Sequence, residues 1–120
     1  MLSKFARASL LALVIAAPAF GAAQARTVYD GRWSLSIMTT RGVCDAYNFP
    51  VDITNGRVSF PGLVRANGRV TGKGSVRVFV SAMGKTASGS GKLSMSSGGG
   101  SWSGRSGDDR CSGRWTAQRS

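Results

Sequence analysis

Short runs in which apolar and polar residues alternate are the feature that most constrains the fold of this chain. Strict alternation puts one set of side chains on each face of an extended strand, so each run indicates a strand with one buried face. The clearest apolar faces are those of Trp33, Leu35 and Ile37, of Phe49, Val51 and Ile53, of Val58 and Phe60, and of Val76, Val78 and Val80. The pattern weakens toward the C-terminus, where it continues through Leu93, Met95, Trp102, Trp115 and Ala117.

Turn-forming residues separate these runs at intervals near ten residues. Asn55-Gly56 and Asn67-Gly68 are strong hairpin signals, because Asn and Gly both accept positive φ. Further reversals are expected at Met83-Gly84-Lys85, at residues 97–100 and at Asp108-Asp109. About eight short strands at this spacing are typical of a small antiparallel barrel, with a β-sandwich as the alternative.

The first and last predicted strands resemble each other. Gly31-Arg32-Trp33 recurs as Gly113-Arg114-Trp115, and each copy lies near a cysteine. The only two cysteines, Cys44 and Cys111, predict one disulfide in an exported chain. That bond would bring the two ends together, and pairing of the first and last strands would close a barrel and remove its exposed edges.

Glycines recur at every second position in two places, at Gly72 and Gly74 and again at Gly89 and Gly91. In a strand this spacing leaves one face without side chains, which fits either the coiling of a small barrel or the close approach of a ring. The rings expected to cover such a face are those of Trp33, Phe79 and Trp102.

The three tryptophans, Trp33, Trp102 and Trp115, each carry a large apolar area, and we expect them to be core residues. The alternative is an aromatic wall around an apolar ligand in the mouth of the barrel. A barrel of about eight strands can hold one small ligand.

The first 25 residues predict export. Lys4 and Arg7 precede the apolar run of residues 10–17, and Ala23-Gln24-Ala25 supplies the small residues after which a signal peptidase cuts. The run is too short to cross the ~30 Å of a bilayer's hydrocarbon core. We therefore expect residues 1–25 to be a cleaved signal peptide. Residues 26–120 would then form a single periplasmic or secreted domain without a transmembrane segment.

The chain is strongly basic. It contains 16 Lys and Arg but only five Asp, no Glu and no His, which gives a net charge of +11, or +9 without Lys4 and Arg7. A field of that sign favours anionic partners. Arginine suits them, because its planar fork meets phosphate or carboxylate with two hydrogen bonds. The candidate binding residues are the arginines opposite core residues in predicted strands: Arg32, Arg57, Arg69, Arg77 and Arg114. Those expected in loops are Arg65, Arg105 and Arg110.

The residue types of common catalytic sites are missing from residues 26–120. Without His and Glu, this part of the chain lacks the usual general bases and cannot form a Ser-His-Asp or Cys-His site. Two cysteines without His make a poor metal site, and a haem iron would depend on Tyr29, Tyr47 or a methionine. We therefore expect no enzyme activity, no cofactor and no metal. Nucleic acid is disfavoured as a partner, because few aromatic residues interleave with the arginines.

The chain carries Gly31-Arg32-Trp33, Cys44, Phe49-Pro50-Val51 and Gly56-Arg57-Val58, and closes with Cys-Ser-Gly-Arg-Trp-Thr-Ala at residues 111–117. This pattern resembles a group of short secreted alphaproteobacterial proteins, some of them loosely labelled as related to haem utilisation or adhesion. The resemblance covers nearly all of residues 26–120 and implies export and the fold, but no activity. The Gly-x-Trp first strand and single disulfide are also similar to those of periplasmic inhibitor β-barrels, which act on proteases or lysozymes.

Two functions are open on this basis. The first is a non-catalytic barrel that binds anionic envelope components, either polysaccharide or lipid head groups, through its surface arginines. The second is a protein–protein inhibitor or interaction module of the periplasm that uses residues 26–30 or the loop of residues 41–45 as its contact. The first predicts binding that weakens steeply with salt, and the second predicts one saturable partner with modest salt dependence.

Overall fold

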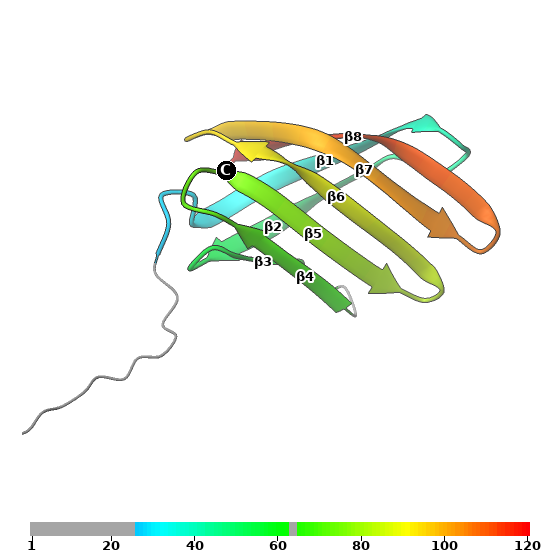
Figure 1. The fold of residues 1–120 in the computed structure, drawn as a ribbon, viewed down its shortest axis with the longest axis horizontal. Helices are drawn as coiled ribbons and strands as arrows, with labels where there is room; N and C mark the ends of the chain where they lie inside the picture. The colour runs from blue at the N-terminus through cyan, green and yellow to red at the C-terminus, as the bar shows by residue number, and fades with distance from the viewer. Residues whose placement is uncertain (1–25, 63–64) are drawn as a thin grey trace, which may run out of the picture.

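The structure is a computed structural model that describes residues 26–62 and 65–120, and these residues form a closed antiparallel barrel (Figure 1). Each strand pairs with the next in sequence, and β1 pairs with β8 to close the barrel. The strands are β1 (Gly31–Arg41), β2 (Tyr47–Thr54), β3 (Arg57–Ser59), β4 (Arg65–Val70), β5 (Ser75–Ala82), β6 (Lys85–Leu93), β7 (Ser97–Ser106) and β8 (Asp109–Arg119). The predicted barrel is therefore confirmed, and the sandwich is not formed. The predicted signal peptide, residues 1–25, lies outside the described residues.

Alternation along the strands sorts the side chains between the interior and the outside of the barrel. The buried core consists of Tyr29, Trp33, Val51, Ile53, Val58, Val70, Val76, Leu93, Trp115 and Ala117. The partly buried side chains packed against it are Leu35, Ile37, Phe49, Phe60, Val78 and Trp102. The inward faces predicted from the alternating runs are thus confirmed. The exception is Met95, which is 63% exposed and lies beyond the end of β6.

Two of the predicted hairpin turns are confirmed by their backbone angles. Asn55-Gly56 joins β2 to β3 with φ of 52° and 77°, and Met83-Gly84 joins β5 to β6 with φ of 50° and 81°. Positive φ at both central residues matches the twist of the turn to that of the flanking strands.

The hairpin predicted at Asn67-Gly68 is wrong, because these residues lie inside β4. Gly68 is required there by packing, since a Cβ at this position would lie only 2.8 Å from Val58 Cβ. The chain turns instead between β4 and β5, through Gly72 and Gly74, which the glycine spacing placed in a strand. A local turn preference was overridden here by close contact with two neighbouring strands.

The reversal predicted at residues 97–100 is also wrong, because these residues begin β7 and the turn lies at residues 94–96. The glycines allow β7 to lie close against β6, where a Cβ on Gly100 would overlap the backbone of its neighbour. The reversal predicted at Asp108-Asp109 is present one residue earlier, and Asp109 already belongs to β8.

Trp115 covers the glycine face of β6 at Gly91, and Trp102, one of the three aromatic residues expected there, lies beside Gly89, where a Cβ would be 3.6 Å from Trp102 Cβ. A Cβ on Gly91 would lie 2.6 Å from Trp115 Cζ2, and Trp115 Nε1 donates a hydrogen bond of 3.1 Å to the backbone of β6. Trp33 and Trp115 are buried in the core as predicted, whereas Trp102 is half-buried. Phe79 points away from the core and is 50% exposed.

The two ends of the barrel differ (Figure 1). At the closed end, residues 26–30 and the turns after β2, β4 and β6 surround the buried side chains of Tyr29 and Trp33. At the open end, where β1 joins β2 and β7 joins β8, the inward side chains are mostly half-buried. The predicted disulfide between Cys44 and Cys111 is confirmed, and it ties the β1–β2 loop to β8 at this open end.

Candidate functional site

Three of the candidate arginines lie side by side on the outer face of the barrel. Arg57 of β3 is paired with Arg69 of β4, and Arg69 is paired in turn with Arg77 of β5. Directly paired residues of antiparallel strands point to the same face, with Cβ atoms about 5 Å apart. All three side chains are exposed, so the strand register gathers three guanidinium groups into one line.

The same line continues around the barrel. Arg77 is paired with Ser90 of β6, Ser90 with Ser101 of β7, and Ser101 with Arg114 of β8. Four of the five candidates therefore share one cross-strand line. We call this set the arginine row: Arg57, Arg69, Arg77 and Arg114.

The arginine row has no acidic partner among the described residues, which include all five aspartates. The one ion pair in residues 26–62 and 65–120 joins Arg32 Nε to Asp52 Oδ1 at 3.2 Å, so Arg32, the fifth candidate, lies apart from the row and is paired. Like charges directly opposite each other on neighbouring strands destabilise a sheet, by on the order of 0.2–1 kcal/mol per pair. An anion bound across the row would remove this repulsion.

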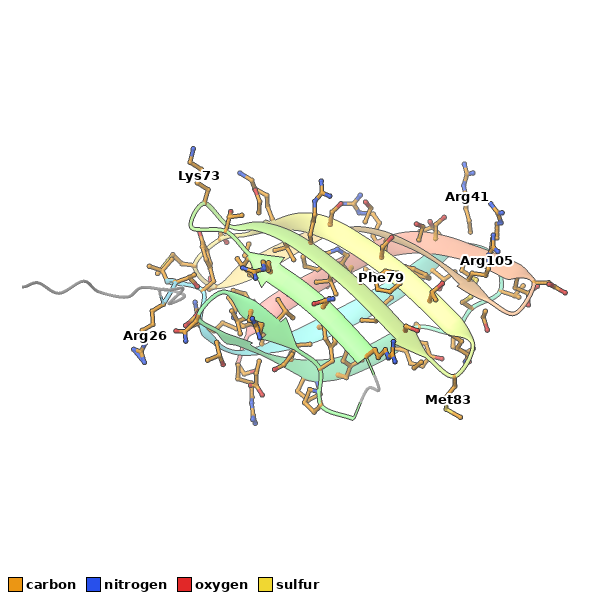
Figure 2. All side chains as sticks on the ribbon, turned by 60° about the horizontal axis from the view of Figure 1, so that its bottom comes forward. Arg26, Arg41, Lys73, Phe79, Met83 and Arg105 are labelled. Carbon is orange, nitrogen blue, oxygen red and sulfur yellow. A yellow bond between two sulfur atoms is a disulfide. The ribbon has the colours of Figure 1, made fainter. Side chains whose placement is uncertain are left out.

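A groove of about 530 Å³ lies beside the arginine row on the outer faces of β5, β6 and β7. The polar and aromatic residues around this serine groove are Asn67, Arg77, Phe79, Ser88, Ser90, Ser101, Trp102 and Ser103. The depression forms because short serine side chains on two strands lie next to the longer side chains of Arg77 and Phe79 on β5. Figure 2 shows Phe79 over the middle of this outer face.

The arginines expected in loops, Arg65, Arg105 and Arg110, lie instead in β4, β7 and β8. The β7–β8 hairpin is longer than predicted, because pairing continues through Arg105 and Arg110 almost to the turn. Figure 2 shows Arg41 and Arg105 at the open end of the barrel. These two arginines are therefore separate from the arginine row.

Arg119 is a structural arginine that the sequence did not single out. Its Nε donates to the carbonyl of Met95 at 2.9 Å, its Nη1 to that of Asp30 at 2.8 Å and its Nη2 to that of Val28 at 2.7 Å. The guanidinium also lies 4.7 Å from the ring centroid of Trp33, so it covers the floor of the closed end. The only sequence signal for this inward position was that Arg119 lies two residues after Ala117, the last inward apolar residue of the final strand.

Asp30 holds the N-terminal segment against the β2–β3 turn. Its carboxylate accepts hydrogen bonds from Thr27 Oγ1 at 2.7 Å, from the Asn55 N–H at 2.6 Å and from the Gly56 N–H at 3.1 Å. Burial raises the pKa of this carboxyl, but the hydrogen bonds lower it by more, so the net pKa lies below the ordinary value of 3.8. Residues 26–30 are therefore bound to the closed end of the barrel.

The described residues bring together no three His, Cys, Asp or Glu side chains that could hold a metal ion. The two candidate haem-ligand tyrosines lie at opposite ends, with Tyr29 buried in the closed end and Tyr47 at 47% exposure near the open end. In the same part of the chain, no helix has the length and apolar character needed to cross a bilayer.

No protein-family model, curated protein or solved structure matches this chain. The candidate site is defined by the strand register, which aligns four arginines, and by the serine groove beside them. Its two chemical properties are positive charge without an acidic partner in the described residues and a concave strip of hydroxyl groups.

Proposed function

We propose that this protein is a non-catalytic barrel that binds acidic polysaccharide of the cell envelope through the arginine row and the serine groove. The observation that carries the proposal is the alignment of exposed, unpaired arginines across neighbouring strands. Guanidinium groups repeated at a strand spacing of about 5 Å suit a polymer with several carboxylates or phosphates better than a single small anion. The predicted export would place the protein where such polymers occur.

The serine groove favours polysaccharide over lipid head groups. Serine hydroxyls donate and accept hydrogen bonds as sugar hydroxyls do. The exposed ring of Phe79 next to Arg77 supplies an apolar face for a sugar ring beside a partner for its carboxylate. A bilayer surface could meet the arginine row, but it is too flat to fill a concave strip between strands.

Titration of the purified, oxidised protein with polygalacturonate tests this proposal. We expect binding at low salt that weakens on the order of 100-fold over a tenfold rise in salt, because about three ion contacts are screened. The double variant Arg69→Ser with Arg77→Ser should weaken low-salt binding by roughly tenfold or more, since it removes two charge-assisted contacts. Neutral dextran should not bind.

The double variant Arg26→Ser with Lys73→Ser is the matched control. It removes the same charge from the closed end, where Figure 2 shows both side chains, and it should bind nearly as the unaltered protein does. Equal loss in the two double variants would show that only net charge matters and would contradict the proposed surface. Binding to phosphatidylglycerol vesicles without binding to polygalacturonate would reassign the surface to lipid head groups.

A protein partner is the second candidate, and the exposure of Val43 favours it. Val43 is 82% exposed in the β1–β2 loop, and the next residue, Cys44, is held to β8 by the disulfide. A constrained loop loses little conformational entropy when it binds. Such a partner would tolerate the Arg69 and Arg77 substitutions and a rise in salt, but it would be lost in Val43→Asp.

A further inference from the structure

The interior of the barrel contains a cavity of about 740 Å³. The cavity reaches from the floor at Trp33 to the β1–β2 loop and the β7–β8 hairpin at the open end. Half-buried apolar side chains form its walls, among them those of Leu35, Ile37, Val78 and Val80. Its volume lies within the roughly 300–1,000 Å³ that is usual for small-molecule sites.

Small residues on β6 and β7 leave this space unfilled. The inward positions there include Ala87, Gly89 and Gly104, and the valines opposite them on β5 are too short to cross the interior. A side chain cannot be added at Gly104, because its Cβ would lie 3.0 Å from Ala87 Cβ and closer still to the backbone of β6. Since protein interiors are normally close-packed, an apolar space of this size indicates a ligand site.

The deep part of the cavity offers apolar contact only. The indole N–H groups of the wall each donate to a backbone carbonyl, at 2.9 Å for Trp33, 3.0 Å for Trp102 and 3.1 Å for Trp115. These donors are therefore already satisfied. The charged residues that line the cavity lie at its mouth, and they are Asp45, Lys85, Arg105 and Asp109.

We propose that this cavity binds one single-chain amphiphile, with a long acyl chain inside the barrel and its polar end at the mouth. An apolar space with one charged opening fits a molecule that is apolar at one end and polar at the other. The chain would cover half-buried side chains such as Ile37 and Val78, which gains the free energy of apolar burial. This site goes beyond the proposed polysaccharide surface, because the arginine row lies on the outer face of the barrel.

Palmitate, titrated into the oxidised protein below its micelle concentration, tests the proposal. We expect about one palmitate per chain, as an eight-stranded barrel has room for one small ligand, and a change in tryptophan fluorescence from Trp102 and Trp115 in the wall. Hexanoate should bind at least 100-fold more weakly, because about ten fewer methylenes would be buried. Equal binding of the two acids, or no binding of palmitate, would overturn the proposal.

Two cavity-filling variants and one control complete the test. Ala87→Trp adds an indole to the cavity and should weaken palmitate binding by roughly tenfold or more, since displacing even two methylenes has that effect. Thr116→Trp adds the same indole to the exposed face of β8 and should leave binding unchanged. If Ala87→Trp does not fold, Val80→Trp on the paired strand and the chain-length comparison decide the result.

Two further outcomes distinguish the cavity from the arginine row and from a dimer interface. The Arg69→Ser with Arg77→Ser variant should bind palmitate normally, so failure of the polysaccharide surface and failure of the cavity are distinguishable. A dimer in sedimentation that covers the mouth and excludes palmitate would overturn the amphiphile and assign the cavity to a second copy of the chain. Unchanged affinity in both folded cavity variants would overturn it as well.

Discussion

At the scale of the residue, Asp30 shows how one carboxylate stabilises an end of the barrel. Burial raises its pKa, but hydrogen bonds from Thr27, Asn55 and Gly56 outweigh burial and hold the pKa below its ordinary value. A lowered folded-state pKa means that the ionised form favours the folded state. The contribution is therefore complete above the unfolded pKa near 4 and is lost as pH falls through the folded pKa.

Asp30→Asn should lower the free energy of unfolding at pH 7, because it replaces charge-assisted hydrogen bonds with weaker neutral ones. The loss should be only about 1 kcal/mol, because solvent screens this partly exposed site. It should also remove part of the loss of stability that the unaltered protein shows on acidification below about pH 4. Urea unfolding at pH 7 and at pH 3 measures both effects. Asp45→Asn in the β1–β2 loop is the control, and an Asp30→Asn deficit of the same size at both pH values would contradict the linkage.

At the scale of the element, β6 and β7 require glycine at particular positions because of what lies against them. A Cβ on Gly91 would come within 2.6 Å of Trp115 Cζ2 and would also overlap the backbone of β7. Neither a buried indole nor a paired strand can move away cheaply. Gly91→Ala should therefore lower the free energy of unfolding by about 2–3 kcal/mol, as overpacking of a core does.

Gly72→Ala is the control for this prediction, since no atom lies within 4 Å of a Cβ built at Gly72 in the β4–β5 turn. It should leave stability unchanged or raise it by up to ~1 kcal/mol, because alanine restricts the unfolded chain. Thermal and urea unfolding of both variants measure the difference. Similar losses at Gly72 and Gly91 would show that glycine's flexibility matters rather than the contact with Trp115.

At the scale of the whole molecule, the barrel is closed both by pairing of β1 with β8 and by the disulfide. The bond between Cys44 and Cys111 spans 67 residues, and a loop of that length corresponds to about 4 kcal/mol of chain entropy. The double variant Cys44→Ser with Cys111→Ser should lower the free energy of unfolding by up to about 4 kcal/mol in urea titrations. It should still fold, because β1 and β8 pair along most of their length. A loss of the far-UV β-sheet signal without denaturant would show that pairing alone cannot close the barrel.

Several features were predictable because they depend on residues close together in the sequence or, for the disulfide, because the chain has only two cysteines. Alternation identified the inward faces of the strands, and Asn55-Gly56 and Met83-Gly84 identified two hairpins. Cys44 had only one possible partner. The same local signals failed at Asn67-Gly68 and at residues 97–100, because glycine there serves close packing between strands rather than a turn.

By itself, the sequence determined the all-β class with about eight strands, the side chains that face the interior and the disulfide between Cys44 and Cys111, whereas the pairing of β1 with β8 decided for a barrel over a sandwich. Only the tertiary structure decided the cross-strand partners, and with them the alignment of Arg57, Arg69 and Arg77, the place of Arg119 in the floor and the size of the cavity. The physical reason is that the period of two along a strand assigns a residue to a face, whereas its neighbours on that face depend on the register between segments distant in the chain.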